Sequence, residues 1–248
     1  MTDWTAFAQT TVLLLLYDMR RYLHLLVTIA LAGVMTSSTL AEKKRAKQEK
    51  GFMALFDGSS TEHWMNARSG QFPAKGWSIE DDSLKCTPKG DGGDIITRDI
   101  YEQFDFRFEW KLAKGANSGV KYFVIRERGS LGHEYQVIDD AGYPNGGSQS
   151  TASFYDVLAP VKDKQLKPTG EFNTSRILVK GQTVKHFLNG KLVLSYDLGS
   201  AGVKAAVASS KFKELEVFGV RLPGHILLQD HGGEVWYRNI RIRNLSEK

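Results

Sequence analysis

The sequence contains little cysteine and little excess charge, and these two shortages exclude several classes of protein. The single cysteine, Cys86, leaves no second thiol for an internal disulfide, and its strand-like surroundings indicate a small buried residue. The net charge is +5 over 248 residues, and the segment 42–50 alone carries +3 of it. The remaining +2 does not supply the basic face that nucleic-acid binding needs, so no nucleic-acid partner is expected.

The sequence also lacks the motifs that hold phosphates, dinucleotides or metal ions. The glycine-rich segment Gly90–Asp94 has neither the spacing nor the strand-to-helix context of a phosphate-binding loop. His225 and His231 are six residues apart on an expected strand, which separates them by about 20 Å, too far to share one ion. No cofactor and no metal ion is therefore expected.

The N-terminal segment has the order of a secretory signal peptide. A basic start at Met19–Arg21 precedes a short apolar stretch and then small residues up to Ala41. Residues 1–41 are therefore predicted to be a signal peptide, with Met19 as an alternative start, and residues 42–50 a charged tail. A membrane anchor is the competing interpretation, because Thr11–Tyr17 is also apolar. After signal removal, no stable membrane insertion is expected.

Apolar residues at every second position dominate the rest of the chain. Phe104–Leu112 alternates strictly between apolar and charged residues, which predicts a half-buried strand with its odd positions in water. Asn189-Gly190 suits a two-residue turn and predicts a hairpin between Thr183–Leu188 and Lys191–Tyr196. Further strands are predicted at 77–80, 83–86, 120–126, 134–138, 153–158, 176–180 and 236–242, with one short helix within 205–215. Residues 51–248 are thus expected to form one all-β sandwich or jelly roll.

Two segments place polar side chains on one face of an expected strand. In Gly224–Gly232, Ile226 and Leu228 share one face, and the opposite face carries His225, Gln229 and His231. In the second segment, Glu134 and Gln136 project outward together, about 7 Å apart. A sheet face of this kind suits a polar ligand, although Glu134 and Gln136 taken by themselves are better explained by a plain solvent-facing strand.

Other polar residues are weaker candidates for the same surface. Asn117 belongs either to a turn or to the site, and Lys121 follows it on an expected strand. Tyr155 and Asp156 lie in a short segment that ends at Pro160, where Asp156 is either a turn residue or a groove carboxylate. Arg238 has the parity of Ile240 and Ile242, so it is expected at the edge of the apolar layer, where structural pairing with a carboxylate is common.

Taken together, these segments resemble the 3-keto-disaccharide hydrolase domain family. The resemblance extends from about Gly51 to Leu245 and rests on the order of its segments rather than on one motif. These segments are Gly51–Gly58 with Trp64, Trp77–Asp81, Gly92–Thr97, Phe104–Leu112, Asn117–Val120, Glu134–Gln136, Leu188–Gly190, Gln229–Gly232 and Arg238–Ile240. The resemblance implies a concanavalin A-like jelly roll, export by bacteria to the periplasm or the medium, and hydrolysis of glycosides that carry a ketone at C3.

This chemistry requires one base, donors for the ketone oxygen and an acid for the leaving group. Glu134 is the preferred base, His231 the alternative base or the acid, and Asp156 a reserve catalytic residue. The expected substrate-binding residues are Asn117, Lys121, Gln136, Tyr155, Gln229 and Arg238, and the expected partner is a small carbohydrate. Two other functions remain open at this point: a non-catalytic sugar-binding module and a conventional jelly-roll glycosidase with two carboxylates.

Overall fold

The structure is a computed structural model that describes residues 49–143 and 146–246. The predicted signal peptide lies outside the described residues. The segment Gly51–Lys248 forms one compact unit. No helix in the described ranges combines the length and the hydropathy needed to cross a membrane.

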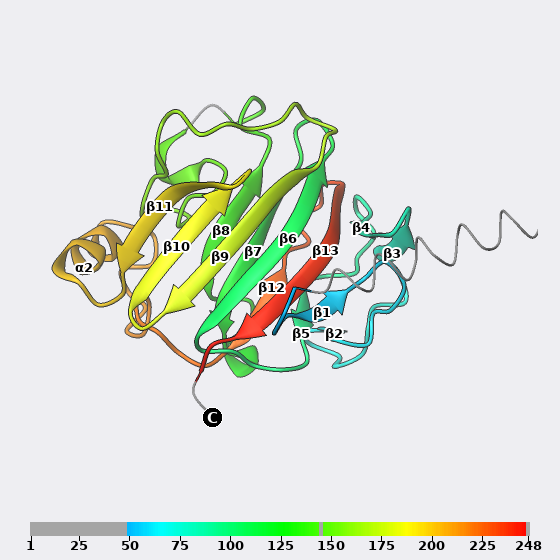
Figure 1. Ribbon diagram of the computed structural model, residues 1–248, viewed down its shortest axis with the longest axis horizontal. Coiled ribbons are helices and arrows are strands. Elements are labelled where there is room, and N and C mark those ends of the chain that lie inside the picture. The colour runs from blue at the N-terminus through cyan, green and yellow to red at the C-terminus, as the bar shows by residue number, and fades with distance from the viewer. Residues whose placement is uncertain (1–48, 144–145, 247–248) are drawn as a thin grey trace, which may run out of the picture. The chain divides into compact units, whose positions relative to one another are not determined.

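Two antiparallel sheets pack face to face in this unit (Figure 1). Sheet A has the strand order β11 (Lys191–Asp197), β10 (Thr183–Leu188), β9 (Asn173–Lys180), β6 (Phe104–Leu112), β13 (Val235–Asn244), β4 (Ser83–Cys86) and β3 (Trp77–Glu80), and β1 (Met53–Phe56) also pairs with β13. Sheet B has the order β2 (Trp64–Asn66), β5 (Ile95–Thr97), β12 (His225–Leu228), β7 (Asn117–Val124) and β8 (His133–Ile138). The arrangement confirms the predicted all-β jelly-roll sandwich.

Alternating strands and tight turns build the sheets as the sequence predicts, except that Asp105, an odd position expected in water, is fully buried. Strand β6 buries Phe104, Phe106 and Phe108 between the sheets, where they belong to one aromatic-rich core. Asn189 and Gly190 both have positive φ angles, 48° and 81°, which allow the two-residue turn between β10 and β11. Cys86 lies fully buried in the core, as predicted.

Three local predictions are wrong. Residues 153–158 make only isolated bridges instead of a strand, because Ala152 and Asp156 have φ angles of 67° and 62° that extended backbone does not allow. The helix α2 spans Ala201–Ala208 rather than lying within 205–215, since Ser200 caps its start by accepting a hydrogen bond from Val203 N. Strand β12 ends at Leu228, so it does not continue to His231.

The predicted parity of Arg238 is also wrong. A bulge in β13 shifts its pairing with β6 between Arg238 and Arg241, and Asn239 has a φ angle of 50° within it. The bulge turns Arg238 to the outer face of sheet A, while Ile240 remains in the core. There the Arg238 Nε donates to Glu109 Oε2 at 2.8 Å, and the guanidinium lies 3.7 Å from the centre of the Phe172 ring.

Candidate functional site

The outer face of sheet B has an apolar half and a polar half. The apolar half is a small buried cluster of Met65, Ile96, Val124 and Leu227. The polar half lies on β7 and β8, where Gly119 and Lys121 are paired with Gln136 and Glu134. As predicted, Ile226 and Leu228 of β12 face the core, which leaves Leu227 on the outer face.

Glu134 lies at the centre of the polar half with its side chain folded over Gly119. A Cβ atom at position 119 would come within 2.3 Å of Glu134 Oε1, so only glycine leaves room for the carboxylate. Glu134 is 7% exposed although it lies on an outer sheet face. The strand pattern predicts the direction of this side chain but not its burial.

Two neighbours contact the Glu134 carboxylate directly. Lys121 Nζ lies 3.9 Å from Glu134 Oε2 and donates to the Ser130 carbonyl at 3.1 Å. The Gln136 amide is assigned with its nitrogen toward Glu134, so that it donates to Glu134 Oε1 and to the Ser118 carbonyl, both at 2.9 Å. The predicted outward pair of Glu134 and Gln136 is therefore present and hydrogen-bonded.

Burial raises the pKa of Glu134 to about 7, although the positive charges of Lys121 and Lys211 act in the opposite direction. The negative charge of Asp94 adds a smaller upward contribution. A carboxyl group with a pKa near neutral pH can both accept and release a proton under physiological conditions, which suits general base catalysis.

Two amide oxygens of the polar half have no hydrogen-bond partner within the described part of the chain. They are Gln229 Oε1 and Asn117 Oδ1, and both atoms are buried. Gln229 follows β12, and its backbone nitrogen donates to the Gly119 carbonyl at 2.9 Å, next to the Glu134 carboxylate. Buried acceptors without a partner are rare in proteins, so these two amides are suited to receive hydroxyl groups of a ligand.

Tyr155, Asp156 and Lys211 lie on loops beside Glu134. The Tyr155 backbone nitrogen donates to the Glu134 carbonyl at 3.0 Å, and Lys211 Nζ lies 4.2 Å from the centre of the Tyr155 ring. Both carboxylate oxygens of Asp156 are engaged, one by Gln149 Nε2 at 3.1 Å and one by the Lys211 backbone nitrogen at 2.9 Å. Asp156 thus fixes the chain that carries Lys211.

Sequence reasoning missed Lys211 and Asp94 as members of this site. Asp94 lies in the loop before β5, where its Oδ1 accepts a hydrogen bond from the Asp230 backbone nitrogen at 2.9 Å. Asp230 in turn accepts from Gly93 N at 3.0 Å, so the two loops are tied together. Both missed residues lie on irregular chain, where no periodic pattern indicates which way a side chain points.

Two predicted site residues do not join the cluster around Glu134. Arg238 lies on the outer face of sheet A, as described above. His231 is exposed beyond the end of β12 and makes no hydrogen bond or ion pair with the residues that the structure describes. The His225 Nδ1 is bonded to the Thr97 carbonyl at 2.7 Å, beside the apolar half. Within the described ranges, no group of three or more His, Cys, Asp and Glu side chains could hold a metal ion.

Comparison with known proteins agrees with this fold. The model of the 3-keto-alpha-glucoside-1,2-lyase-like domain family matches residues 51–243. The chain belongs to this family. A relative, the 3-keto-disaccharide hydrolase of Bacteroides thetaiotaomicron, is 32% identical over an alignment of 231 residues, and the match covers 79% of this chain and 79% of the other.

Solved structures of similar chains have the same fold as this protein. A candidate glycosyl hydrolase from Parabacteroides distasonis is 31% identical, with a TM-score of 0.72 over 83% of this chain and 97% of the other. A second candidate glycosyl hydrolase from the same organism is 28% identical, with a TM-score of 0.61 over 78% of this chain and 99% of the other. The lyase-like family fold thus spans the whole sandwich, including both strands that carry the polar cluster.

Proposed function

We propose that the protein hydrolyses 3-keto-glycosides by elimination followed by hydration, with Glu134 as the base. The observation that carries this proposal is the Glu134 carboxyl group, which is buried on a sheet face, flanked by Lys121, and has a pKa near 7. The family membership and the name of the Bacteroides relative supply the substrate class.

A ketone at C3 makes the proton on C2 acidic. Glu134 takes that proton, the C1–oxygen bond breaks, and the aglycone leaves with the bonding electrons and takes up a proton from solvent, which the water added in the second step replaces. The remaining enone has a C1–C2 double bond. Water then adds its oxygen to C1, and a proton returns to C2, so that the sum of both steps is hydrolysis. The carboxyl group formed in the first step exchanges its proton with solvent while the enone is bound, and it is the natural donor for the second step.

The charges around Glu134 suit this reaction. Negative charge develops on the C3 oxygen when the C2 proton leaves, and positive groups fixed nearby stabilise it. Lys121 and Lys211 both act on Glu134 electrostatically. Asn117 and Gln229 offer unpaired amide oxygens to sugar hydroxyls. In this assignment, Lys121 and Lys211 polarise the ketone, and the amides hold the ring.

The deciding experiment compares a 3-keto-glucoside with its unoxidised parent in water and in heavy water. The expected result is that only the 3-keto-glucoside is cleaved. In heavy water, its sugar product should carry deuterium at C2. A parallel incubation of 3-keto-glucose without protein measures spontaneous exchange at C2. Cleavage without enzyme-dependent deuterium would contradict elimination, and binding without turnover would indicate a sugar-binding module.

A conventional two-carboxylate glycosidase is the second candidate function. It is favoured by Asp94, whose charge acts on Glu134 and which thus provides a second carboxylate near it. Such an enzyme would cleave the unoxidised parent, because its mechanism needs no ketone. The same comparison of substrates therefore separates the two functions.

We also propose that the protein acts in the periplasm or outside a bacterial cell, because of the order of basic, apolar and small residues that begins at Met19. N-terminal sequencing of the exported protein tests this proposal. A start near Glu42 supports it, and an intact chain in the cytosol contradicts it.

Replacing Lys211 by methionine is expected to raise the pKa of Glu134, because a positive charge that favours its ionised form is lost. The rising limb of the activity–pH profile should move to higher pH by less than about one unit, the scale of an exposed charge interaction. Lys213, which is exposed two residues further on, provides the matched Lys213→Met control. An unchanged profile in Lys211→Met would remove Lys211 from the site.

Replacing Gln229 by alanine is expected to raise KM about threefold to tenfold, the value of one hydrogen bond to a ligand. The melting temperature should hardly change, because the Gln229 side-chain oxygen has no partner among the residues that the structure describes and its backbone bonds remain. Enzyme kinetics and thermal unfolding measure the two effects, with the exposed Gln182→Ala as control. A large loss of stability would instead assign Gln229 a structural role.

A further inference from the structure

A cavity of about 290 Å³ lies at another part of the sandwich, between the chain around strands β7 and β8 and the segment that follows helix α2. None of its lining residues belongs to the polar cluster around Glu134. Its walls are mainly apolar, with Leu131 46% and Val217 40% exposed at the surface. The apolar residues that matter here are Phe123, Ile125, Leu131, Leu215, Val217 and Phe218.

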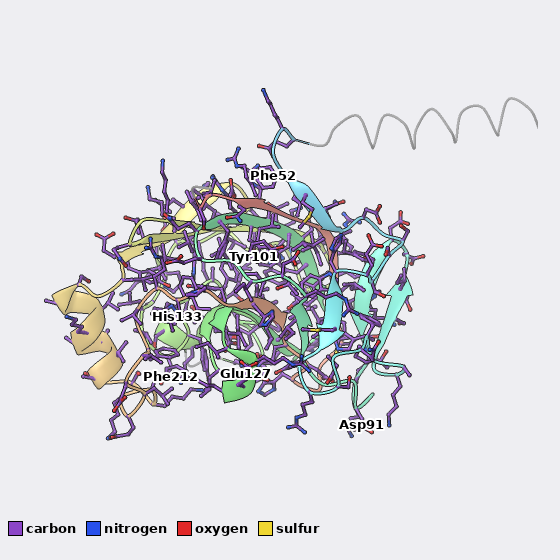
Figure 2. The ribbon with its side chains drawn as sticks, turned by 90° about the horizontal axis from the view of Figure 1, so that it is seen from below. Phe52, Asp91, Tyr101, Glu127, His133 and Phe212 are labelled. Carbon is purple, nitrogen blue, oxygen red and sulfur yellow. The ribbon has the colours of Figure 1, made fainter. Side chains whose placement is uncertain are left out.

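His133 is the one uncharged polar side chain in the lining of this cavity, and it is 2% exposed. Figure 2 shows His133 and Phe212 at the end of the sandwich that carries helix α2, with Asp91 at the opposite end. The His133 Nε2 accepts a hydrogen bond from the Gly219 backbone nitrogen at 3.0 Å. The proton of the neutral ring must therefore reside on Nδ1.

The Nδ1–H group of His133 has no partner among the described residues. Aromatic side chains surround the imidazole: the ring centroids of Phe154 and Phe218 lie 4.8 and 4.9 Å from that of His133. Burial lowers the pKa of His133 to about 3, so the imidazole is neutral near pH 7 and cannot gain stability by ionising. Leaving a donor buried and unpaired costs about 1–3 kcal/mol, and folded proteins seldom retain one without a reason.

A mainly apolar cavity with a small number of polar groups is the usual composition of a small-molecule site. Such sites measure about 300–1,000 Å³, so this cavity suits a molecule of one or two rings. Charges of both signs line it, Arg128 on one side and Glu214 and Glu216 on the other. Opposite charges of this kind do not favour an ionic ligand.

We propose that this cavity is a second ligand site, which binds a neutral aromatic or alicyclic molecule carrying one acceptor oxygen. The ring fills the apolar walls, and the oxygen accepts the hydrogen bond from His133 Nδ1. The proposal does not depend on the proposed reaction, because it rests on residues outside the cluster around Glu134.

The experiment titrates the full protein with 2-acetylnaphthalene and with 2-ethylnaphthalene, which has the same shape but no oxygen. Binding is followed by NMR, including the His133 Nδ1–H resonance. Saturable binding of the acetyl compound is expected, with about tenfold weaker binding of the ethyl compound. Val217→Asp should weaken binding at least tenfold, whereas Val161→Asp, at a position 47% exposed and outside the cavity, should leave it unchanged.

Three results would overturn the proposal. The first is the absence of saturable binding up to the solubility limit of 2-acetylnaphthalene. The second is equal affinity for the acetyl and ethyl compounds, which would show that no hydrogen bond forms. The third is undiminished binding to Val217→Asp, which would place the compound elsewhere. Both substituted positions are partly exposed, so neither variant should prevent folding.

Discussion

Glu134→Gln is expected to lower the turnover of a 3-keto-glucoside by about 10² to 10⁴, the usual contribution of a positioned base. Glutamine keeps the shape of the side chain and its hydrogen-bonding capacity but cannot take the C2 proton. Substrate binding should therefore persist. Steady-state kinetics on the purified variant measure the loss, and the exposed Glu127→Gln serves as the control.

The pH dependence of the wild-type protein provides an independent readout of the same residue. Glu134 must be ionised to act as a base, so activity should rise with pH and level off above its pKa of about 7. The residual activity of Glu134→Gln should not show this rise with pH. Full activity of the variant would eliminate Glu134 as the base.

Stability should change with pH in the opposite direction. The folded pKa of Glu134 is raised from its ordinary value of 4.5 to about 7, so between these values the folded state holds a proton that the unfolded chain has lost. Stability thus falls as pH rises through this window, by about 3 kcal/mol in total, and levels off above it. Glu134→Gln should accordingly be more stable than the wild type at pH 8 and equally stable at pH 4.

The opposed trends explain why a base on this sheet costs the fold stability. The burial that raises the pKa of Glu134 toward neutrality also penalises its ionised, active form. A more exposed glutamate would reduce the stability of the folded state less, but its lower pKa would make it a weaker base. Denaturant unfolding at the two pH values separates a functional carboxylate from a structural one, because replacing a structural carboxylate would destabilise the protein at pH 8.

The sequence predicted those parts of the fold that depend on local pattern. Strict alternation in Phe104–Leu112 and the Asn189-Gly190 turn both gave correct strands. The failures occur where a single backbone angle breaks the pattern. The φ angle of 50° at Asn239 reverses the face of Arg238, and the φ angle of 62° at Asp156 prevents a strand there. Neither asparagine nor aspartate requires such an angle, so its position cannot be predicted from residue type.

Only those residues of the candidate site that lie on strands could be predicted from the sequence. Period two placed Glu134 and Gln136 on one face correctly, because paired strands keep their register. Lys121 was a candidate only for its charge and position, and it is paired with Glu134 across the two strands. The loop residues Lys211 and Asp94 reach Glu134 through folding of distant segments, which no local pattern encodes. The buried state of Glu134, and hence its pKa, also depends on those loops and cannot be derived from its own strand.

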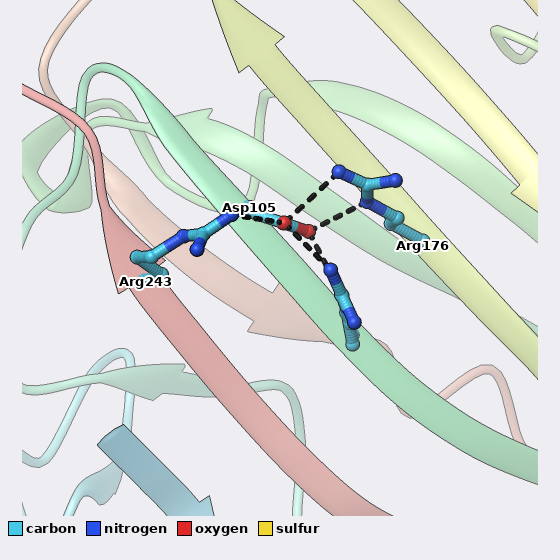
Figure 3. Close-up of polar contacts among 4 residues, drawn as sticks. Asp105, Arg176 and Arg243 are labelled. Atoms are coloured by element: carbon cyan, nitrogen blue, oxygen red, sulfur yellow. Dashed lines mark hydrogen bonds and ion pairs between the residues drawn. The ribbon is translucent and has the colours of Figure 1, made fainter. Parts of the chain in front are cut away.

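Asp105→Asn is expected to destabilise the fold by about 3 kcal/mol, at the lower end of the usual cost of removing one partner of a buried ion pair. The Asp105 side chain is fully buried on the outer side of β6 and contacts three arginines (Figure 3). Arg176 Nε donates to Asp105 Oδ1 at 2.7 Å, Arg107 Nη2 to Oδ2 at 3.0 Å, and Arg243 Nη2 to Oδ2 at 3.2 Å. Asparagine removes the negative charge that holds these three cations together.

The three arginines are partly exposed, so they regain some hydration when the carboxylate is lost, which explains a cost at the lower end. A domain of this size should lose about 6 to 12 °C in melting temperature for such a change. The exposed Asp163→Asn is the control. In the double variant Asp105→Asn/Arg243→Gln the loss should be less than the sum of the single losses, because one of the mutually repelling cations is gone.

The contribution of Asp105 to stability should increase with rising pH, whereas that of Glu134 decreases. Burial alone would raise the pKa of Asp105, but hydrogen bonds from Arg107 and Arg176 outweigh it and hold the pKa below 3.8. Its contribution is therefore complete above pH 3.8 and disappears only as the pH falls through the lower, folded value. The difference in the free energy of unfolding between wild type and Asp105→Asn should be complete at pH 5 and should disappear in stronger acid. A difference that disappears near pH 7 would show that another group stabilises these strands, because the Asp105 carboxylate does not titrate there.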